Sequence, residues 1–392
     1  MLSRLDNETI CRVGKGTPMG DLMREYWVPF ALATEIGGAD CDPARIMVLG
    51  QRFLAIRTTS GGIPMLMDEE CPHRGASMWY GRNEDEGGIR CVYHGWKFDG
   101  GGRCVDMPNE PPGSNFKDKV RLPTYPVSEA GGLLWAYLAR ARHRHPCRAS
   151  SGWARTARAP PGRSSASATG CRRSRATSTP ATSVSCTSGT HSPATPPRTR
   201  SCATPSRTGR RATRCSTPSS ARPTGGPTGP PVTRTGCTGV SRTSCSPFYT
   251  MVPTGGVLGT KLQIRAWVPM DDSHTMAFHS APTVRRYTAP ASQKVGITER
   301  EATATEFLPN TTDWFGRFRI TARRENDHLI DRALQRSGES YTGLGGGVNI
   351  EDQAITESMG DIYDRTKEHL GSSDVMVIRV RRRLLAAARA LA

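Results

Sequence analysis

Apolar and polar residues alternate over short distances in the first third of this 392-residue chain. Runs such as ARIMVLGQRFLAIRT, IPMLMDEE, IRCVYHGWKFD and GGLLWAYLA are rich in β-type residues and are separated by Gly, Pro and Asp. Short apolar runs bounded by turn residues are typical of strands. The pattern therefore predicts a small antiparallel β domain over residues 1–139.

Strand and helix patterns are combined in residues 247–392. PFYTMVPT, KLQIRAWVPM and HTMAFHS are expected to be strands, and NDHLIDRALQ one or two helical turns. NIEDQAITESMGDIYDRTKEHLG has Ile355, Met359 and Ile362 at helical spacing and Gly371 at its end. SSDVMVIRVRRRLLAAARALA predicts a final helix capped by Ser372 or Ser373.

The segment between them, residues 140–246, has neither the apolar period of 2 that is typical of strands nor the period of 3.6 that is typical of helices. Of its 107 residues, 101 are Ser, Pro, Thr, Ala, Cys, Trp, Arg or Gly, the eight residue types whose codons carry C or G at the second position. A GC-rich gene carries C or G at nearly every third codon position. When it is read one base late, these third positions become second positions, which yields this restricted set. A disordered linker is the alternative, but linkers usually contain Glu, Lys and Gln. We expect residues 140–246 to be out of frame, and hence non-native or disordered.

The formal net charge of +18 arises in the same segment, which holds 19 Arg and no Lys, Asp or Glu. The other residues carry 34 basic and 35 acidic side chains, so they are close to neutral. A basic nucleic-acid-binding protein is a third hypothesis. It is disfavoured because the Arg-rich segment lacks Lys and interleaved aromatic residues.

The N-terminus MLSRLDNETICRVGKG has no apolar core of a signal peptide, and no run of 18 apolar residues occurs. We therefore expect a cytoplasmic protein that binds neither membrane nor nucleic acid. Its cysteines are then expected to be metal ligands or free thiols rather than disulfides.

One motif carries specific chemistry, the stretch CPHRGASMWYGRNEDEGGIRCVYHGW. Cys71 and His73 form C-x-H, and Cys91 and His94 form C-x2-H, with seventeen residues between the two pairs. Two thiolates and two imidazoles at the tips of two β-loops suit a Rieske [2Fe–2S] cluster, with both sulfurs on one iron and both nitrogens on the other. A structural Cys2His2 zinc site is the alternative, although zinc fingers usually pair C-x2-C with H-x3-H.

Residues around this motif fit a cluster as well. Gly75 and Gly95 would let backbone amides approach the inorganic sulfides. Trp96 and Tyr93 could shield the cluster from water, although each, taken alone, fits an ordinary core residue better.

With these motifs the chain resembles the α (oxygenase) subunit of Rieske non-haem iron aromatic-ring oxygenases, in the phthalate dioxygenase, phenoxybenzoate dioxygenase and vanillate demethylase branch. The resemblance covers residues 1–139 and 247–392 and is most specific at CPHRGAS and CVYHGWKFDGGGRC. WVPMDDSHTMAF, NDHLIDRALQ and EDQAITESMGDIYDRTKEHLGSSD add to it. It implies an α+β fold, with a Rieske β domain before an α/β helix-grip catalytic domain whose first half is disrupted here.

The family also holds a mononuclear Fe(II) with two His and one carboxylate, which leaves positions open for dioxygen and substrate. The resemblance assigns the carboxylate to Asp352, with Glu351 as the neighbouring alternative. Asp352 could instead only stabilise a helix N-terminus. The two His come from a D-x2-H-x4-H motif, and one in-frame reading of TGCRRSRATSTPATSVSCT, NWLQAIEGDIDTSHVGFLH, contains it.

In the chain as written, the two His positions are Thr182 and Thr187, and Thr179 replaces the acid that would bridge to a neighbouring cluster. Hydroxyls do not replace imidazole on Fe(II), so we expect no intact catalytic site. His274 and His279 are also H-x4-H, but on a strand their odd separation points them to opposite faces. His191 lies in the out-of-frame segment, and His328 and His369 are expected to be surface or core residues.

The resemblance implies partners and a reaction. An NAD(P)H-dependent flavin/ferredoxin-type reductase supplies electrons, and dioxygen hydroxylates or O-demethylates a small aromatic substrate. An intact member is expected to be a homotrimer. A second hypothesis is a Rieske electron-transfer protein without oxygenase activity, because the cluster motif is complete and the iron motif is not.

Overall fold

The computed structural model describes residues 2–84, 88–139, 166–172, 243–245, 247–253, 262–280, 306–345 and 348–391. Side chains are not described for residues 166–172, 243–245, 251–253, 262–264, 280 and 348. The candidate positions Thr179, Thr182, Thr187 and His191 lie outside these ranges.

The chain begins with two short helices, which the alternation of apolar residues did not predict. Helix α1 (Arg4–Cys11) starts where the Ser3 hydroxyl accepts the Asp6 N–H. Helix α2 (Pro18–Arg24) starts where the Thr17 hydroxyl accepts the Gly20 N–H. Both have the oxygen-bearing N-cap that helices prefer, and α2 has Pro at its first position. The β domain predicted over residues 1–139 therefore begins with two helices that its pattern of apolar residues did not indicate.

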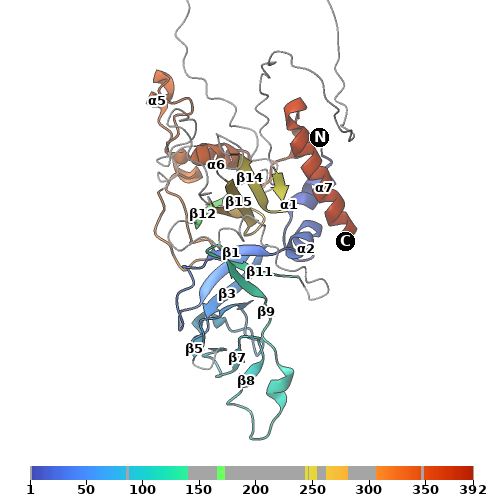
Figure 1. The fold of residues 1–392 in the computed structure, drawn as a ribbon, viewed down its shortest axis with the longest axis vertical. Helices are drawn as coiled ribbons and strands as arrows, with labels where there is room; N and C mark the ends of the chain where they lie inside the picture. Colours follow the sequence, from blue (N-terminus) through green and yellow to red (C-terminus); the bar gives the residue numbers. More distant parts are fainter. Residues whose placement is uncertain are drawn as a thin grey trace, which may run out of the picture. The chain divides into compact units, whose positions relative to one another are not determined.

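Three antiparallel sheets make up the rest of the N-terminal domain (Figure 1). Their strand orders are β1-β11-β10, β2-β3-β4-β9 and β5-β6-β7-β8. The strands are β1 (Val28–Leu32), β2 (Ala44–Val48), β3 (Gln51–Arg57), β4 (Pro64–Asp68), β5 (Arg82–Glu84), β6 (Gly88–Arg90), β7 (Lys97–Asp99), β8 (Cys104–Asp106), β9 (Thr124–Tyr125), β10 (Val127–Ala130) and β11 (Leu133–Ala136). The 3-10 helices Met78–Tyr80 and Phe116–Lys119 lie between them. The predicted β domain is confirmed.

A five-stranded antiparallel sheet, in the order β12-β16-β15-β14-β13, forms the described part of the C-terminal domain. The strands are β12 (Ala166–Arg172), β13 (Thr243–Cys245), β14 (Tyr249–Pro253), β15 (Leu262–Pro269) and β16 (His274–Ser280). The three central strands coincide with the three predicted ones. Both edge strands come from the segment of restricted composition, where only backbone pairing is described.

Helices complete this domain. They are η4 (Arg324–Leu329), α5 (Arg332–Ser337), α6 (Val348–Ser358), η5 (Arg365–Lys367), η6 (Ser372–Asp374) and α7 (Val375–Leu391). Helix α6 ends earlier than predicted, and Ile355 and Met359 are exposed rather than buried. The final helix starts differently as well. Gly371 is the N-cap of η6, which leads directly into α7, so Ser372 and Ser373 lie inside the first turn rather than at the cap. The carboxylate of Asp374 accepts the N–H of Gly371 (2.8 Å).

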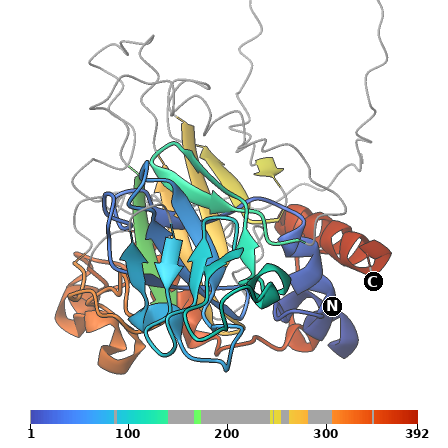
Figure 2. The same cartoon turned by 90° about the horizontal axis from the view of Figure 1, so that it is seen from below.

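Two hydrophobic cores hold these elements. The first contains residues from α1, α2, β1, β3, β11, β14, β15, β16 and α7. In Figure 2, α1 and α2 (blue) lie beside α7 (red), and both contact it. The second core lies within the N-terminal domain and includes Cys71, Cys91, Trp96 and Cys104. The cysteines of the candidate cluster are thus part of a core whose buried residues all lie within residues 1–139, with Trp314 of the C-terminal part packed against it.

Candidate metal-cluster site

Two loops of the N-terminal domain share one pattern of backbone hydrogen bonds. In the loop between β4 and β5, the Cys71 N–H donates to the Ala76 carbonyl (2.8 Å), and the Gly75 N–H donates to the Cys71 carbonyl (2.9 Å). In the loop between β6 and β7, the Cys91 N–H donates to the carbonyl five residues on (2.9 Å), and the Gly95 N–H to the Cys91 carbonyl (3.0 Å). Gly75 and Gly95 have φ angles of 73° and 76°, which favour glycine.

The four predicted ligands form two pairs at these loops. The Cys71 and Cys91 side chains are buried and lie within hydrogen-bonding contact of each other. The rings of His73 and His94 lie edge to face with 4.5 Å between their centroids. The structure therefore brings together all four residues that the motif singled out.

The pKa values at the site indicate that the two cysteines can be thiolates only when a cation lies beside them. Burial, with the nearby Cys91 adding to it, raises the pKa of Cys71 to about 11. Burial, followed by the charges of His94 and Arg74, lowers the pKa of His73. Neutral imidazole is the form that binds metal, whereas thiols must lose their protons to do so. Two adjacent thiolates then require a positive charge beside them.

Several features fit a two-iron cluster. The Nδ1 atom of His94 is buried and has no hydrogen-bond partner, so its lone pair is available to a metal. Space is open at Gly75, where no atom lies within 4 Å of the position that a Cβ would take. A cluster that places sulfur and nitrogen ligands on different iron atoms fits the two pairs.

Aromatic side chains cover the imidazoles unequally. Trp96 is 4% exposed and stacks on His73, with 4.2 Å between centroids and 11° between planes. Its indole N–H donates to Oδ1 of Asn109 (2.7 Å). Tyr93 contacts His94 (3.8 Å between centroids) but is 57% exposed. Trp96 therefore has the geometry of a shield, whereas Tyr93 lies mainly in solvent.

Comparison with known proteins decides the family. A model of the Rieske [2Fe-2S] domain matches residues 26–126, and a model described as "LigXa C-terminal domain like" matches residues 246–392. The oxygenase subunit of 3-chlorobenzoate-3,4-dioxygenase from Comamonas testosteroni is 35% identical over 408 residues, which cover 98% of this chain and 88% of that protein. The chain belongs to the Rieske oxygenases. It is an oxygenase (α) subunit by family, and members of this family are oxidoreductases that use a Rieske cluster and a mononuclear iron.

A second relative matches one region, and a solved structure matches nearly the whole chain. The phthalate 4,5-dioxygenase oxygenase subunit from Pseudomonas putida is 44% identical over 138 residues, which are 35% of this chain and 31% of that protein. A solved oxygenase–ferredoxin complex of carbazole 1,9a-dioxygenase has a TM-score of 0.52 at 17% identity, covering 98% of this chain and 96% of that one. The structural likeness supports the predicted α+β fold.

The expected carboxylate ligand of the second metal is described, whereas the expected histidine positions are not. Asp352 lies half-buried on α6, in contact with other residues, and Glu351 accepts the Thr342 hydroxyl (2.6 Å). Thr182 and Thr187, which the resemblance places at the two histidine positions, lie outside the described residues. Threonine hydroxyls would not suit Fe(II), which in this family takes two imidazoles. The assignment of these three positions stays a prediction, and no catalytic step is built on them.

The other histidine pair has different partners. The Nδ1 atom of His274 lies 3.0 Å from Oδ1 of Asp271, and its ring stacks on Phe315 (4.1 Å between centroids). His279 packs edge-on against Trp267. Burial opposes ionisation of Asp271, but hydrogen bonds from His274 and Ser273 prevail and lower its pKa to about 2. That these histidines are not iron ligands stays a prediction.

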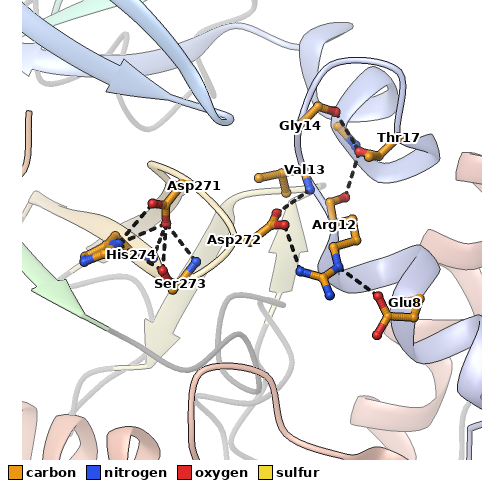
Figure 3. Close-up of polar contacts among 10 residues, drawn as sticks. Glu8, Arg12, Val13, Gly14, Thr17, Asp271, Asp272, Ser273 and His274 are labelled. Atoms are coloured by element: carbon orange, nitrogen blue, oxygen red, sulfur yellow. Dashed lines mark hydrogen bonds and ion pairs between the residues drawn. The ribbon is translucent and has the colours of Figure 1, made fainter.

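The turn that carries Asp271 also binds the N-terminal segment (Figure 3). Its neighbour Asp272 accepts the Val13 N–H at Oδ1 (3.0 Å) and pairs with Arg12 at Oδ2 (3.0 Å). Arg12 in turn pairs with Glu8 (2.8 Å). The DDSH motif, identified above only by resemblance, therefore has a structural role: it ties β15 and β16 to α1.

A buried pair near Asp352 was missed by sequence reasoning. His328 and Glu357 are almost fully buried, with 3.3 Å between Nε2 and Oε2, and Gln353 donates to the other Glu357 oxygen (2.8 Å). His328 was expected to be a surface or core residue, and it is a core residue. Its pairing with Glu357 could not be read from the sequence, because the two lie 29 positions apart with no motif between them.

Proposed function

We propose that the intact protein is a complete Rieske oxygenase subunit and that residues 140–246 are its catalytic-domain segment read out of frame. The observation that supports this is the position of the two family models. They match residues 26–126 and 246–392, so the second begins where the restricted composition ends. Two compensating single-base changes would shift the reading frame between them and leave it intact on either side. Matches to the family on both sides of an unmatched segment are therefore expected.

The reaction proposed for the intact protein is oxygenation of a small aromatic acid or aryl ether. Related oxygenase subunits are named for 3-chlorobenzoate, phthalate and 5,5'-dehydrodivanillate. An NAD(P)H-dependent reductase, of flavin or ferredoxin type, would deliver electrons one at a time to a cluster held by Cys71, His73, Cys91 and His94. The solved complex of a related oxygenase with ferredoxin supports this kind of partner. We further propose a homotrimer in the cytoplasm. In the described chain, no helix combines the length and apolarity needed to cross a membrane.

The chain as written is proposed to keep the electron-accepting half of this machinery alone. Its cluster residues are complete, whereas Thr182 and Thr187 stand at the proposed iron-ligand positions. It would then act as a Rieske electron-transfer protein, which is the second candidate function. The two candidates differ in iron content, because a complete subunit binds three irons per protomer and a cluster protein binds two.

Resequencing the DNA that encodes residues 135–250 is the first test. Single-base differences near both ends would restore a D-x2-H-x4-H motif and support the complete oxygenase. A confirmed sequence would reject the frame proposal and leave the electron-transfer candidate.

Iron content tests the second candidate on the protein itself. The chain as written, reconstituted anaerobically with iron and sulfide, is expected to be brown, to hold two irons per protomer and to show no substrate-coupled dioxygen uptake. A third iron with coupled uptake would contradict the proposal. Restoring the reading frame is expected to add one iron, and substituting the two restored histidines with threonine should remove it again.

A further inference from the structure

The stack of Trp96 on His73 joins the two cluster loops. His73 belongs to the loop that follows β4, whereas Trp96 belongs to the loop that precedes β7. With 4.2 Å between centroids and 11° between planes, the indole covers one face of the imidazole. The backbone of Trp96 is already fixed, because its carbonyl accepts the Cys91 N–H (2.9 Å). The indole could still rotate about its side-chain bonds unless other contacts hold it.

Asn109 supplies that restraint from a third segment, the chain after β8. Its Oδ1 atom accepts the indole N–H of Trp96 at 2.7 Å. Phe116 packs edge-on against the same indole, with 6.3 Å between centroids and 75° between planes. A ring held by a hydrogen bond at its rim and by packing on its face has one orientation. Without the acceptor, the buried N–H would favour orientations that reach water, and these tilt the indole away from His73.

We propose that Asn109 is a positioning residue for the Rieske cluster: it holds Trp96 parallel to His73 and thereby sets the midpoint potential. The proposal rests on His73 as an iron ligand. Reduction adds one negative charge to the cluster, and water stabilises that charge better than an indole does. A fixed indole therefore lowers the potential, and a loosened one raises it.

The test is a potentiometric titration of the full chain, reconstituted with iron and sulfide and followed by EPR. Asn109→Leu removes the acceptor, and Trp96→Phe keeps a ring but removes the N–H. Each is expected to raise the ratio of reduced to oxidised cluster three- to tenfold at a fixed applied potential. The double variant should equal either single variant, because both remove one hydrogen bond.

Two further variants separate this role from general damage to the fold. Asn109→Asp keeps an acceptor at the same place and adds a negative charge, so it should retain the wild-type EPR line shape and shift the potential downward. Trp79→Phe alters another indole of the same domain, which lies over Arg45 rather than His73, and should leave the potential unchanged.

The outcomes are distinguishable. A colourless wild-type protein would overturn the ligand assignment together with this proposal. A coloured Asn109→Leu protein with an unchanged potential would overturn the positioning role alone. So would additive shifts in the double variant. If Asn109→Leu fails to fold, Trp96→Phe and Asn109→Asp still give opposite expected shifts, and shifts of one sign would reject the proposal.

Discussion

At the scale of single residues, the cluster ligands could be predicted from the sequence and their supporting residues could not. Cys71, His73, Cys91 and His94 follow from spacing, because each pair lies within one loop. Asn109 lies 13 residues from its partner Trp96, and no spacing rule connects an indole to its acceptor. The fold alone brings them together, and the same holds for His328 and Glu357.

Cysteines of the N-terminal core offer a matched pair of substitutions. Cys71 and Cys104 are both buried in the same core, but the Cys104 thiol contacts the Asp106 carbonyl (3.4 Å) and belongs to neither cluster loop. Cys71→Ala is expected to abolish the brown colour and both irons, whereas Cys104→Ala keeps them and destabilises the fold by about 1 kcal/mol. Iron analysis and visible circular dichroism check this. Loss of the cluster in Cys104→Ala, or its retention in Cys71→Ala, would contradict the assignment.

Protonation of His328 should make stability depend on pH. Burial lowers the pKa of His328, although the nearby acids Glu325 and Asp327 oppose this shift. The unfolded chain therefore takes up a proton before the folded chain does. Stability present at neutral pH is lost as the pH falls below about 6.5, by at most about 1.4 kcal/mol for each unit of the shift.

His328→Gln isolates this group, because glutamine can still donate to Glu357 and does not titrate. Thermal unfolding at pH 7.5 and 5.5 is expected to show a smaller difference in Tm for this variant than for the wild type. Equal differences would show that His328 does not carry the pH dependence.

At the scale of elements, patterns of period 2 located the strands, whereas the two N-terminal helices were not predicted, although their cap residues are present in the sequence. The central strands β14, β15 and β16 fall where alternation placed them. Helix α1 has few apolar residues, and α2 spans only seven residues, so Met19, Leu22 and Met23 make a single turn of helical spacing. Ser3 and the Thr17–Pro18 pair nevertheless mark the starts of the two helices. Helix α6 stops at Ser358 because Gly360, with a φ of 86°, turns the chain.

Attachment of α1 to the sheet depends on both oxygens of Asp272. Asp272→Asn keeps an acceptor for the Val13 N–H and loses only the half-exposed ion pair with Arg12, so we expect a loss of at most about 0.5 kcal/mol. Asp272→Ala leaves the amide without its partner and should cost about 1–2 kcal/mol. Denaturant unfolding of both variants checks the order. A larger loss for the asparagine variant would show that the ion pair is the stronger contact.

At the scale of the whole molecule, both cluster loops lie before the boundary at residue 139, whereas one of the two cores contains residues from both sides of it. All buried residues of the core around Cys71 and Cys91 lie within residues 1–139, and only the partly buried Trp314 packs against it from the C-terminal part. The other core mixes β1 and β11 with Phe248, Val268 and Leu384. Further contacts cross the boundary, since the Tyr249 hydroxyl donates to the Trp27 carbonyl (2.7 Å) and Arg317 pairs with Glu35 (2.5 Å). Sequence patterns locate elements, but they do not show which apolar faces meet.

An isolated fragment of residues 1–139 should therefore keep its cluster site but lack the C-terminal elements that cover part of its apolar surface. It is expected to bind two irons, because both loops and their core remain, and to expose the apolar faces of β1 and β11 that otherwise meet β14 and β15. Exposed apolar surface of this kind binds hydrophobic dyes and favours association. We expect the fragment to bind such a dye, to self-associate and to unfold at a lower Tm than the full chain, with the cluster spectrum unchanged. A monomeric fragment with the full chain's Tm would mean that the shared core adds nothing to the cluster domain. A fragment without a cluster would mean that the C-terminal elements hold the loops in place.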